Sequence, residues 1–239
     1  LTEADRNALS DLISQISTQV FSQTSQKVED IETTNYATFK KEFFSTIKTY
    51  SLATLNNTKR IIISNEPEAE VLRYVHKEEV TKIFEARKRK IIDFYFNSIQ
   101  SKNEHRIADA IKYAYWGNVL LNSHPYSHEI FVDGEGGQKV FLNTKFQVLL
   151  NEFFQKLDVE ITDIEKDGNF ENIKLNIYFE ETPVVNLDYK YWDGVDWSPV
   201  YSAKDGTGII ELTGVSTQIE NLKIKVEYEF LHEVRIDKE

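Results

Sequence analysis

The chain of 239 residues has a hydrophobic share of 41% and an aromatic share of 13%, which are typical of a folded globular protein and argue against disorder. It contains no cysteine, which excludes disulfides, thiolate metal sites and a cysteine nucleophile within the chain. Residues 129–239 carry 11 basic and 23 acidic side chains, and this balance argues against a nucleic-acid surface there, because phosphate contacts need Lys and Arg.

Residues 1–75 are predicted to form an α+β domain. Apolar residues recur at helical spacing from Ala8 to Ile16, and residues 17–21 then become β-branched and aromatic with no intervening glycine or proline. We therefore expect a helix that runs directly into a strand. One further helix and two paired strands are predicted in this domain: Tyr36–Tyr50, Ile61–Ile63 and Val71–Val75. These strands are too few to close a sheet, so we expect a first strand upstream of Leu1.

Residues 76–156 are predicted to be a helical segment followed by a connector. The stretch 78–100 has no glycine or proline, and a polar break at 101–104 separates it from a second apolar helix over 107–120. Small alanines opposite large aromatics indicate a tightly packed helical hairpin, similar to a single tetratricopeptide-like pair. A β-hairpin around Asp133-Gly134 and a short helix over 146–154 complete the connector.

Residues 157–239 are predicted to form a β-sandwich of the immunoglobulin-like type. Apolar and polar residues alternate along three runs, which are 173–179, 185–191 and 222–230. Asp-Gly pairs at 167, 193 and 205 supply the turns between strands. One-sided strands at such short intervals are typical of small sandwiches. The predicted fold class is therefore α+β multidomain, with an α+β domain, a helical hairpin and a sandwich.

Two histidines are weak candidates for metal ligands. His124 and His128 are four residues apart, a spacing that places two side chains on one face of a helix. Pro125 disturbs the helix that this geometry needs, which favours a polar loop at a helix end. A metal-dependent hydrolase using the pair is the remaining enzymatic hypothesis. We predict no metal, no cofactor and no catalytic residue.

A run of four basic residues forms a candidate basic patch: Arg87, Lys88, Arg89 and Lys90. Such a cluster could bind phosphate groups or an anionic lipid surface. Lysine and arginine on a long helix more often form a solvated face, and a run of four is short. We favour the solvated face.

Five aromatic residues crowd one predicted hairpin and form the candidate ligand-binding set: Tyr189, Tyr191, Trp192, Trp197 and Tyr201. If exposed, they would make a stacking platform for a sugar ring or a peptide. If buried, they would be part of the sandwich core, which is the commoner place for large aromatics. We favour the core, least strongly for the two tryptophans.

The chain resembles the twenty-kilodalton lipoprotein family of bacterial envelope proteins, whose fold is similar to the N-terminal domain of flagellar assembly protein T. The matching motifs are the segment Ala4–Gln23 with the strand pair of 61–75. In multidomain Bacteroidetes-type members, segments like Tyr115–Pro125 and Leu187–Gly206 follow. The resemblance implies export to the periplasm or outer membrane through a lipid anchor, which we expect upstream of Leu1. The family offers no catalytic residues.

Together these patterns predict a non-enzymatic cell-envelope protein that serves as a structural or protein-interaction scaffold. Its expected partners are other envelope proteins, with no nucleic acid and with membrane contact only through an anchor outside this chain. The alternative is a glycan- or peptide-binding module that uses the aromatics of the 189–201 hairpin.

Overall fold

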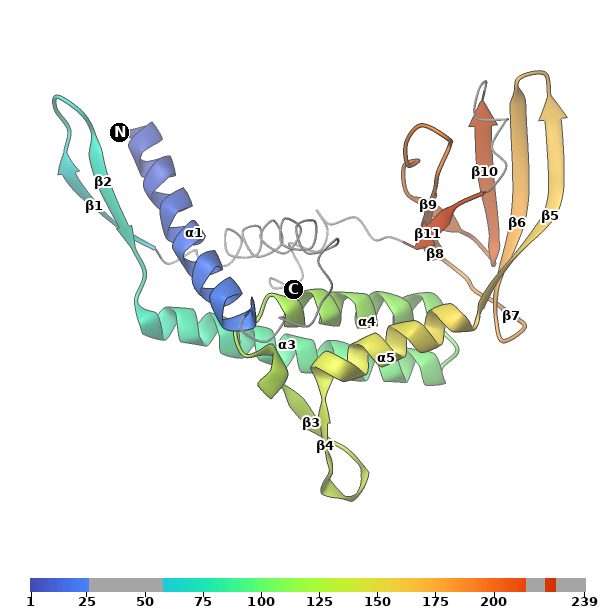
Figure 1. Ribbon diagram of the computed structural model, residues 1–239, viewed down its shortest axis with the longest axis horizontal. Coiled ribbons are helices and arrows are strands. Elements are labelled where there is room, and N and C mark those ends of the chain that lie inside the picture. The colour runs from blue at the N-terminus through green and yellow to red at the C-terminus, as the bar shows by residue number, and fades with distance from the viewer. Residues whose placement is uncertain (26–57, 214–221, 227–239) are drawn as a thin grey trace. The chain divides into compact units, whose positions relative to one another are not determined.

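The computed structural model describes residues 1–25, 58–213 and 222–226, and Figure 1 shows them as coloured ribbons. These residues form an α+β structure with four α-helices and several antiparallel sheets, which confirms the predicted class. They divide into two compact units. The first unit includes Leu1–Phe94 and Trp116–Lys145, and the second includes Tyr95–Tyr115 and Phe146–Glu233. The predicted domain limits at 75 and 156 stay a prediction.

The first helix, α1, runs from Thr2 to Ser25 without interruption. The predicted change to a strand at residues 17–21 is therefore wrong, and this part of the motif behind the family resemblance is helical. Serine, threonine and valine lower helix stability by at most about 0.7 kcal/mol each relative to alanine, so they do not end a helix that is already propagating. Helix propagation outweighs the local β-propensity of residues 17–21.

An antiparallel ribbon of two strands, β1 (Lys59–Ser64) and β2 (Glu70–Tyr74), confirms the predicted strand pair. Helix α1 lies against β2, as Figure 1 shows. Arg73 donates two hydrogen bonds to the carboxylate of Asp5, at 2.7 and 2.6 Å, and this pairing lowers the pKa of Asp5. The predicted helix over 36–50 lies outside the described residues.

Two long helices, α3 (Lys77–Asn103) and α4 (Ile107–Asn122), confirm the predicted helical pair. Ala110 and Ala114 on α4 are fully buried. The hydroxyl of Ser98 on α3 donates to the carbonyl oxygen of Ala110 on α4 at 2.7 Å.

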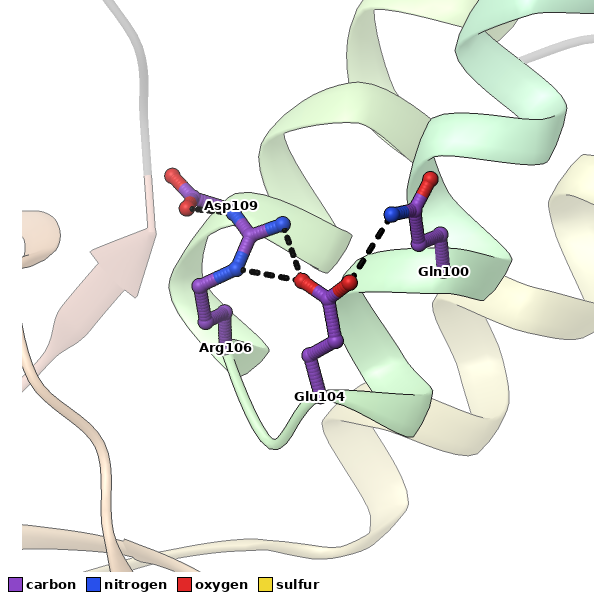
Figure 2. A network of polar contacts seen from close by, with 4 residues as sticks. All are labelled: Gln100, Glu104, Arg106 and Asp109. Atoms are coloured by element: carbon purple, nitrogen blue, oxygen red, sulfur yellow. Dashed lines mark hydrogen bonds and ion pairs between the residues drawn. The ribbon is translucent and has the colours of Figure 1, made fainter.

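A polar network closes the turn between α3 and α4, as shown in Figure 2. Glu104 accepts hydrogen bonds from Gln100 at 2.8 Å and from Arg106 at 2.7 Å, and these bonds lower the pKa of Glu104. Arg106 also pairs with Asp109 in the first turn of α4. An acidic residue there interacts favourably with the positive end of the helix dipole.

The connector contains a short hairpin and a helix, as predicted. Strands β3 (Phe131–Asp133) and β4 (Lys139–Phe141) pair antiparallel, and short 3₁₀ turns lie at Ser127–Glu129 and Glu135–Gly137. Helix α5 (Leu142–Gln155) follows directly. Among the described residues, no helix is long and apolar enough to cross a membrane.

Two small antiparallel sheets complete the second unit. The first has the order β10-β6-β5 with β7 paired to β6, and the second has the order β11-β8-β9. The strand bounds are β5 (Leu157–Asp167), β6 (Phe170–Phe179), β7 (Thr182–Pro183), β8 (Leu187–Tyr191), β9 (Tyr201–Ala203), β10 (Thr207–Thr213) and β11 (Ile224–Val226). Of the predicted strand at 222–230, the part beyond residue 226 lies outside the described residues.

Tyrosine side chains from β8 connect the two sheets. The hydroxyl of Tyr189 accepts from the backbone N–H of Ile209 and donates to its carbonyl oxygen, both at 2.7 Å. Tyr191 makes the same pair of bonds to Glu211, at 3.2 and 2.9 Å. Gly208 on β10 lies at this contact between the sheets. A Cβ atom at position 208 would stand 2.6 Å from the side chain of Leu175 and 2.8 Å from the hydroxyl of Tyr189. A side chain at position 208 would therefore displace Leu175 or Tyr189 from the contact between the sheets.

Candidate functional site

The candidate aromatic set is divided between the sandwich core and its surface. Tyr189 and Tyr191 are 1% and 4% exposed, so they are core residues, and burial raises the pKa of Tyr189. Tyr201 is half-buried, with its ring 5.4 Å from that of Tyr191, and its hydroxyl donates to Glu211 at 3.2 Å. The side chains of all three tyrosines therefore contact other residues of the chain.

The two tryptophans form a different environment, which we call the tryptophan corner (Trp192, Trp197 and Lys225). Both rings are half-buried, and they meet edge to face at 5.8 Å with an angle of 68° between their planes. The ammonium group of Lys225 lies 4.4 Å from the centre of the Trp197 ring, a cation–π contact. Inclined rings do not make a flat platform. They leave an angular aromatic surface with a cation at its side.

A capped turn joins the two tryptophans. The carboxylate of Asp193 accepts hydrogen bonds from the backbone N–H groups of Val195 and Asp196, both at 2.8 Å. These bonds lower the pKa of Asp193, so the carboxylate stays ionised and the turn stays closed at neutral pH. Val195 at the tip is 76% exposed. The sequence Asp-Gly predicted this turn.

The two candidate metal-ligating histidines have different roles. His124 is 4% exposed, its Nε2 lies 3.1 Å from the carbonyl oxygen of Phe84, and its Nδ1 accepts from the N–H of Tyr126 at 3.1 Å. Since a backbone N–H can only donate, Nδ1 is the unprotonated nitrogen and Nε2 carries the proton. Both nitrogens are thus engaged in backbone hydrogen bonds. His128 lies next to Ser127 in a 3₁₀ turn, with 3.5 Å between its Nδ1 and the serine hydroxyl.

The neutral form of His124 is strongly favoured. Burial is the main cause, with the nearby charge of Arg87 adding to it, and the pKa of His124 falls to about 4. Such a shift occurs at many catalytic histidines, but this ring holds two backbone groups and faces the core. The arrangement positions the end of α4 against α3.

The basic run does not form one continuous surface. Arg87 is only 3% exposed, and its guanidinium donates to the carbonyl oxygen of Ser123 at 3.3 Å. Lys90 lies over the ring of Phe94 at 5.3 Å, and Arg89 is exposed. Consecutive residues on a helix are distributed around its axis, so the four cations face different surroundings. Arg87 stands at helical spacing from Phe84, Ile91 and Phe94, so it lies on the apolar side of α3. This spacing is the feature of the sequence that predicts its burial.

The sequence analysis missed a cluster of exposed apolar residues on the β1–β2 ribbon. We call this cluster the ribbon patch: Ile61, Ile62, Ile63 and Leu72, which are between 41% and 57% exposed. Ile61 and Leu72 are opposite each other across the ribbon. Three consecutive isoleucines are typical of a buried strand, but an apolar run alone does not distinguish a core strand from an exposed one.

A second exposed apolar row lies along β5. Val159, Ile161 and Ile164 are 47%, 48% and 47% exposed, whereas their partners on β6 are at most 6% exposed. Paired residues share one face of a sheet, so this β5 row continues the core face of β6. The alternation in Leu-Asp-Val-Glu-Ile at residues 157–161 predicts which side chains of β5 share the apolar face. Whether that face is exposed depends on which other elements cover it.

Among the residues that the structure describes, no three His, Asp or Glu side chains gather closely enough to hold a metal ion. The chain matches no protein-family model, no curated protein and no solved structure. The exposed apolar strands and the tryptophan corner are therefore the features from which function is argued.

Proposed function

We propose that this chain is a non-enzymatic protein-interaction scaffold of the bacterial cell envelope. The observation that carries the proposal is the ribbon patch, in which four large aliphatic side chains stand exposed on one two-stranded ribbon. Ile61 and Leu72 share one face of the ribbon, and Ile62 points to the other, so both faces carry exposed apolar side chains. Exposed apolar surface of this kind is typical of sites that bind other proteins. The polar contacts described above stabilise turns, helix ends and the contact between the sheets. Such structural roles are consistent with a scaffold.

The finer fold classes are part of the same proposal. The antiparallel helices α3 and α4, with buried alanines on α4 and the Ser98 hydrogen bond between them, support a single tetratricopeptide-like pair. The two antiparallel sheets joined through Tyr189 support an immunoglobulin-like sandwich. Both kinds of module commonly serve as spacers and docking surfaces, although fold alone does not assign a role. The envelope location rests on the family resemblance.

We expect the double variant Ile61→Ser with Leu72→Ser to lose the partner protein that copurifies with the wild-type chain from envelope extracts. The exposed pair contributes little to stability, at most about 0.5 kcal/mol, so the fold should persist in circular dichroism. Val195→Ser is the control, because it removes an exposed aliphatic side chain elsewhere and should keep the partner. Recovery of the same partner with the double variant would contradict the assignment of the ribbon patch.

The tryptophan corner supports a second candidate function, the binding of a glycan or peptide. Both rings are half-buried, so neither is shielded from a ligand, and the Asp193 turn holds them in place. A sugar ring stacks on such aromatic faces, while Lys225 offers a hydrogen-bond donor beside them.

We expect chitotetraose, a soluble amino-sugar probe, to shift the emission of the tryptophan corner to shorter wavelength and to reduce its quenching by acrylamide. The measurement uses a Trp116→Phe background, so that only Trp192 and Trp197 emit. Trp192→Ala in the same background should abolish both effects. Unchanged emission and unchanged quenching at saturating probe would count against glycan binding.

A further inference from the structure

Among the described residues, two strands have an unpaired edge, and both carry exposed apolar side chains. Within the described ranges β1 pairs with β2 alone, and β5 pairs with β6 alone. The ribbon patch lies on and beside the first edge, and the row Val159, Ile161 and Ile164 lies on the second. An open edge presents unpaired backbone N–H and C=O groups, which is a template for adding another strand.

The two edges carry opposite charge. β5 has five carboxylates and one lysine in 11 residues. Asp163 and Glu165 are bound by Lys174, but the side-chain carboxylates of Asp158 and Glu160 make no hydrogen bond or ion pair with any part of the chain that the structure describes. Their negative charge is therefore available to a partner.

The β1 edge begins with two cations. The ammonium group of Lys59 likewise has no ion pair or hydrogen bond among the described residues. Arg60 is 46% exposed and lies 3.6 Å from Asp5, a contact that still leaves much of the guanidinium in solvent. The β1 edge thus combines positive charge with exposed isoleucine, and the β5 edge combines negative charge with exposed valine and isoleucine.

Charge decides which edges can pair. Two β5 edges would place carboxylates opposite carboxylates, and like charges directly opposite one another destabilise a strand pair. Two β1 edges would place Lys59 and Arg60 opposite each other in a parallel pair, and in an antiparallel pair would place them opposite Ile63 and Ser64, which carry no opposite charge. A β1 edge against a β5 edge brings opposite charges together and covers apolar side chains from both. This combination alone satisfies both the charges and the apolar rows.

We propose that the β1 edge of one copy of this chain pairs with the β5 edge of a second copy, head to tail. The proposal rests on the scaffold function and names its partner as a second copy. Because the two surfaces differ, the contact is heterologous, and it propagates into a ring or an open chain of copies. Its electrostatic part weakens with salt, since the Debye length falls from about 30 Å at 0.01 M to about 3 Å at 1 M.

Sedimentation velocity of the intact chain across a wide concentration range tests the proposal. At low salt the wild type should associate as its concentration rises and should dissociate in high salt. Lys59→Glu alone, and Asp158→Lys with Glu160→Lys, should each weaken self-association about tenfold. Lys204→Glu reverses an exposed charge away from both edges and is the matched control, which should associate like the wild type.

Mixing the two charge-reversed variants is the decisive arm. Each variant alone loses the charge complementarity between its two edges, because Lys59→Glu leaves Arg60 as the one cation of β1 and the double reversal leaves β5 with as many basic as acidic side chains. The mixture again offers an unaltered β1 edge and an unaltered β5 edge, so association should return. A wild type that stays monomeric at low salt, or a mixture that stays monomeric, would overturn the proposal. Copurification of a different protein through the ribbon patch would then still support the scaffold function, so the two failures are distinguishable.

Discussion

Phe153→Ala is expected to destabilise the second unit by about 3–5 kcal/mol, the usual cost of removing a large aromatic side chain from a core. Phe153 on α5 is fully buried, with its ring 6.1 Å from that of Phe179 on β6. The ammonium group of Lys102 lies 5.7 Å from the centre of the same ring. The substitution therefore leaves a cavity where α5, α3 and the first sheet meet. Urea unfolding followed by tryptophan fluorescence measures the effect.

The neighbouring residue provides the control for this experiment. Phe154 is 46% exposed, so Phe154→Ala should change the free energy of unfolding by at most about 0.5 kcal/mol. If Phe153→Ala does not fold, Phe153→Leu keeps most of the volume and should lose roughly half as much. Equal effects at positions 153 and 154 would mean that α5 does not pack as described.

The stability of the first unit is expected to fall as the pH is lowered from 6.5 towards 4, because of His124. The pKa of this histidine is about 4 in the folded chain and about 6.5 when unfolded, since burial disfavours the charged ring. Between these values the unfolded state binds a proton that the folded state does not, so stability increases with pH across this window. The loss amounts to about 2 kcal/mol by pH 5 and about 3 kcal/mol by pH 4.

Denaturation curves at a series of pH values, with the wild type and two variants, separate His124 from the other histidines. His124→Gln should remove the dependence between pH 6.5 and 5, whatever its effect on stability at neutral pH. His128→Gln should leave that dependence in place. A wild-type stability that is constant between pH 7 and pH 5 would show that the ring is not held neutral.

The parts of the fold that could be predicted from the sequence are those with one-sided burial. Apolar and polar residues alternate clearly along β6 because one face of the strand lies in the core, where Leu175 and Ile177 are almost fully buried. The aromatic set was also predictable in part. Tyr189 and Tyr191 are two residues apart and share a face, while Trp192 follows Tyr191 and must point to the other side.

Other features depend on contacts that no local pattern records. The continuation of α1 past Ile16 depends on helix propagation, which outweighs the weak strand preference of the residues after it. Arg87 is drawn into the core by a carbonyl group at the end of α4. The exposure of Ile61 and Val159 depends on which surfaces remain uncovered after folding. The ribbon patch and the β5 row are therefore defined by tertiary packing and not by any local sequence pattern.

Site-specific photo-cross-linking from Leu72 in the producing cells tests the scaffold function most directly. Leu72 is 48% exposed within the ribbon patch, and Val195 at the tryptophan corner serves as the reference position. The account predicts a discrete adduct with another polypeptide, either a second copy or an envelope protein, from a photoreactive residue at 72 but not at 195. No adduct from position 72, or the same adducts from both positions, would contradict it.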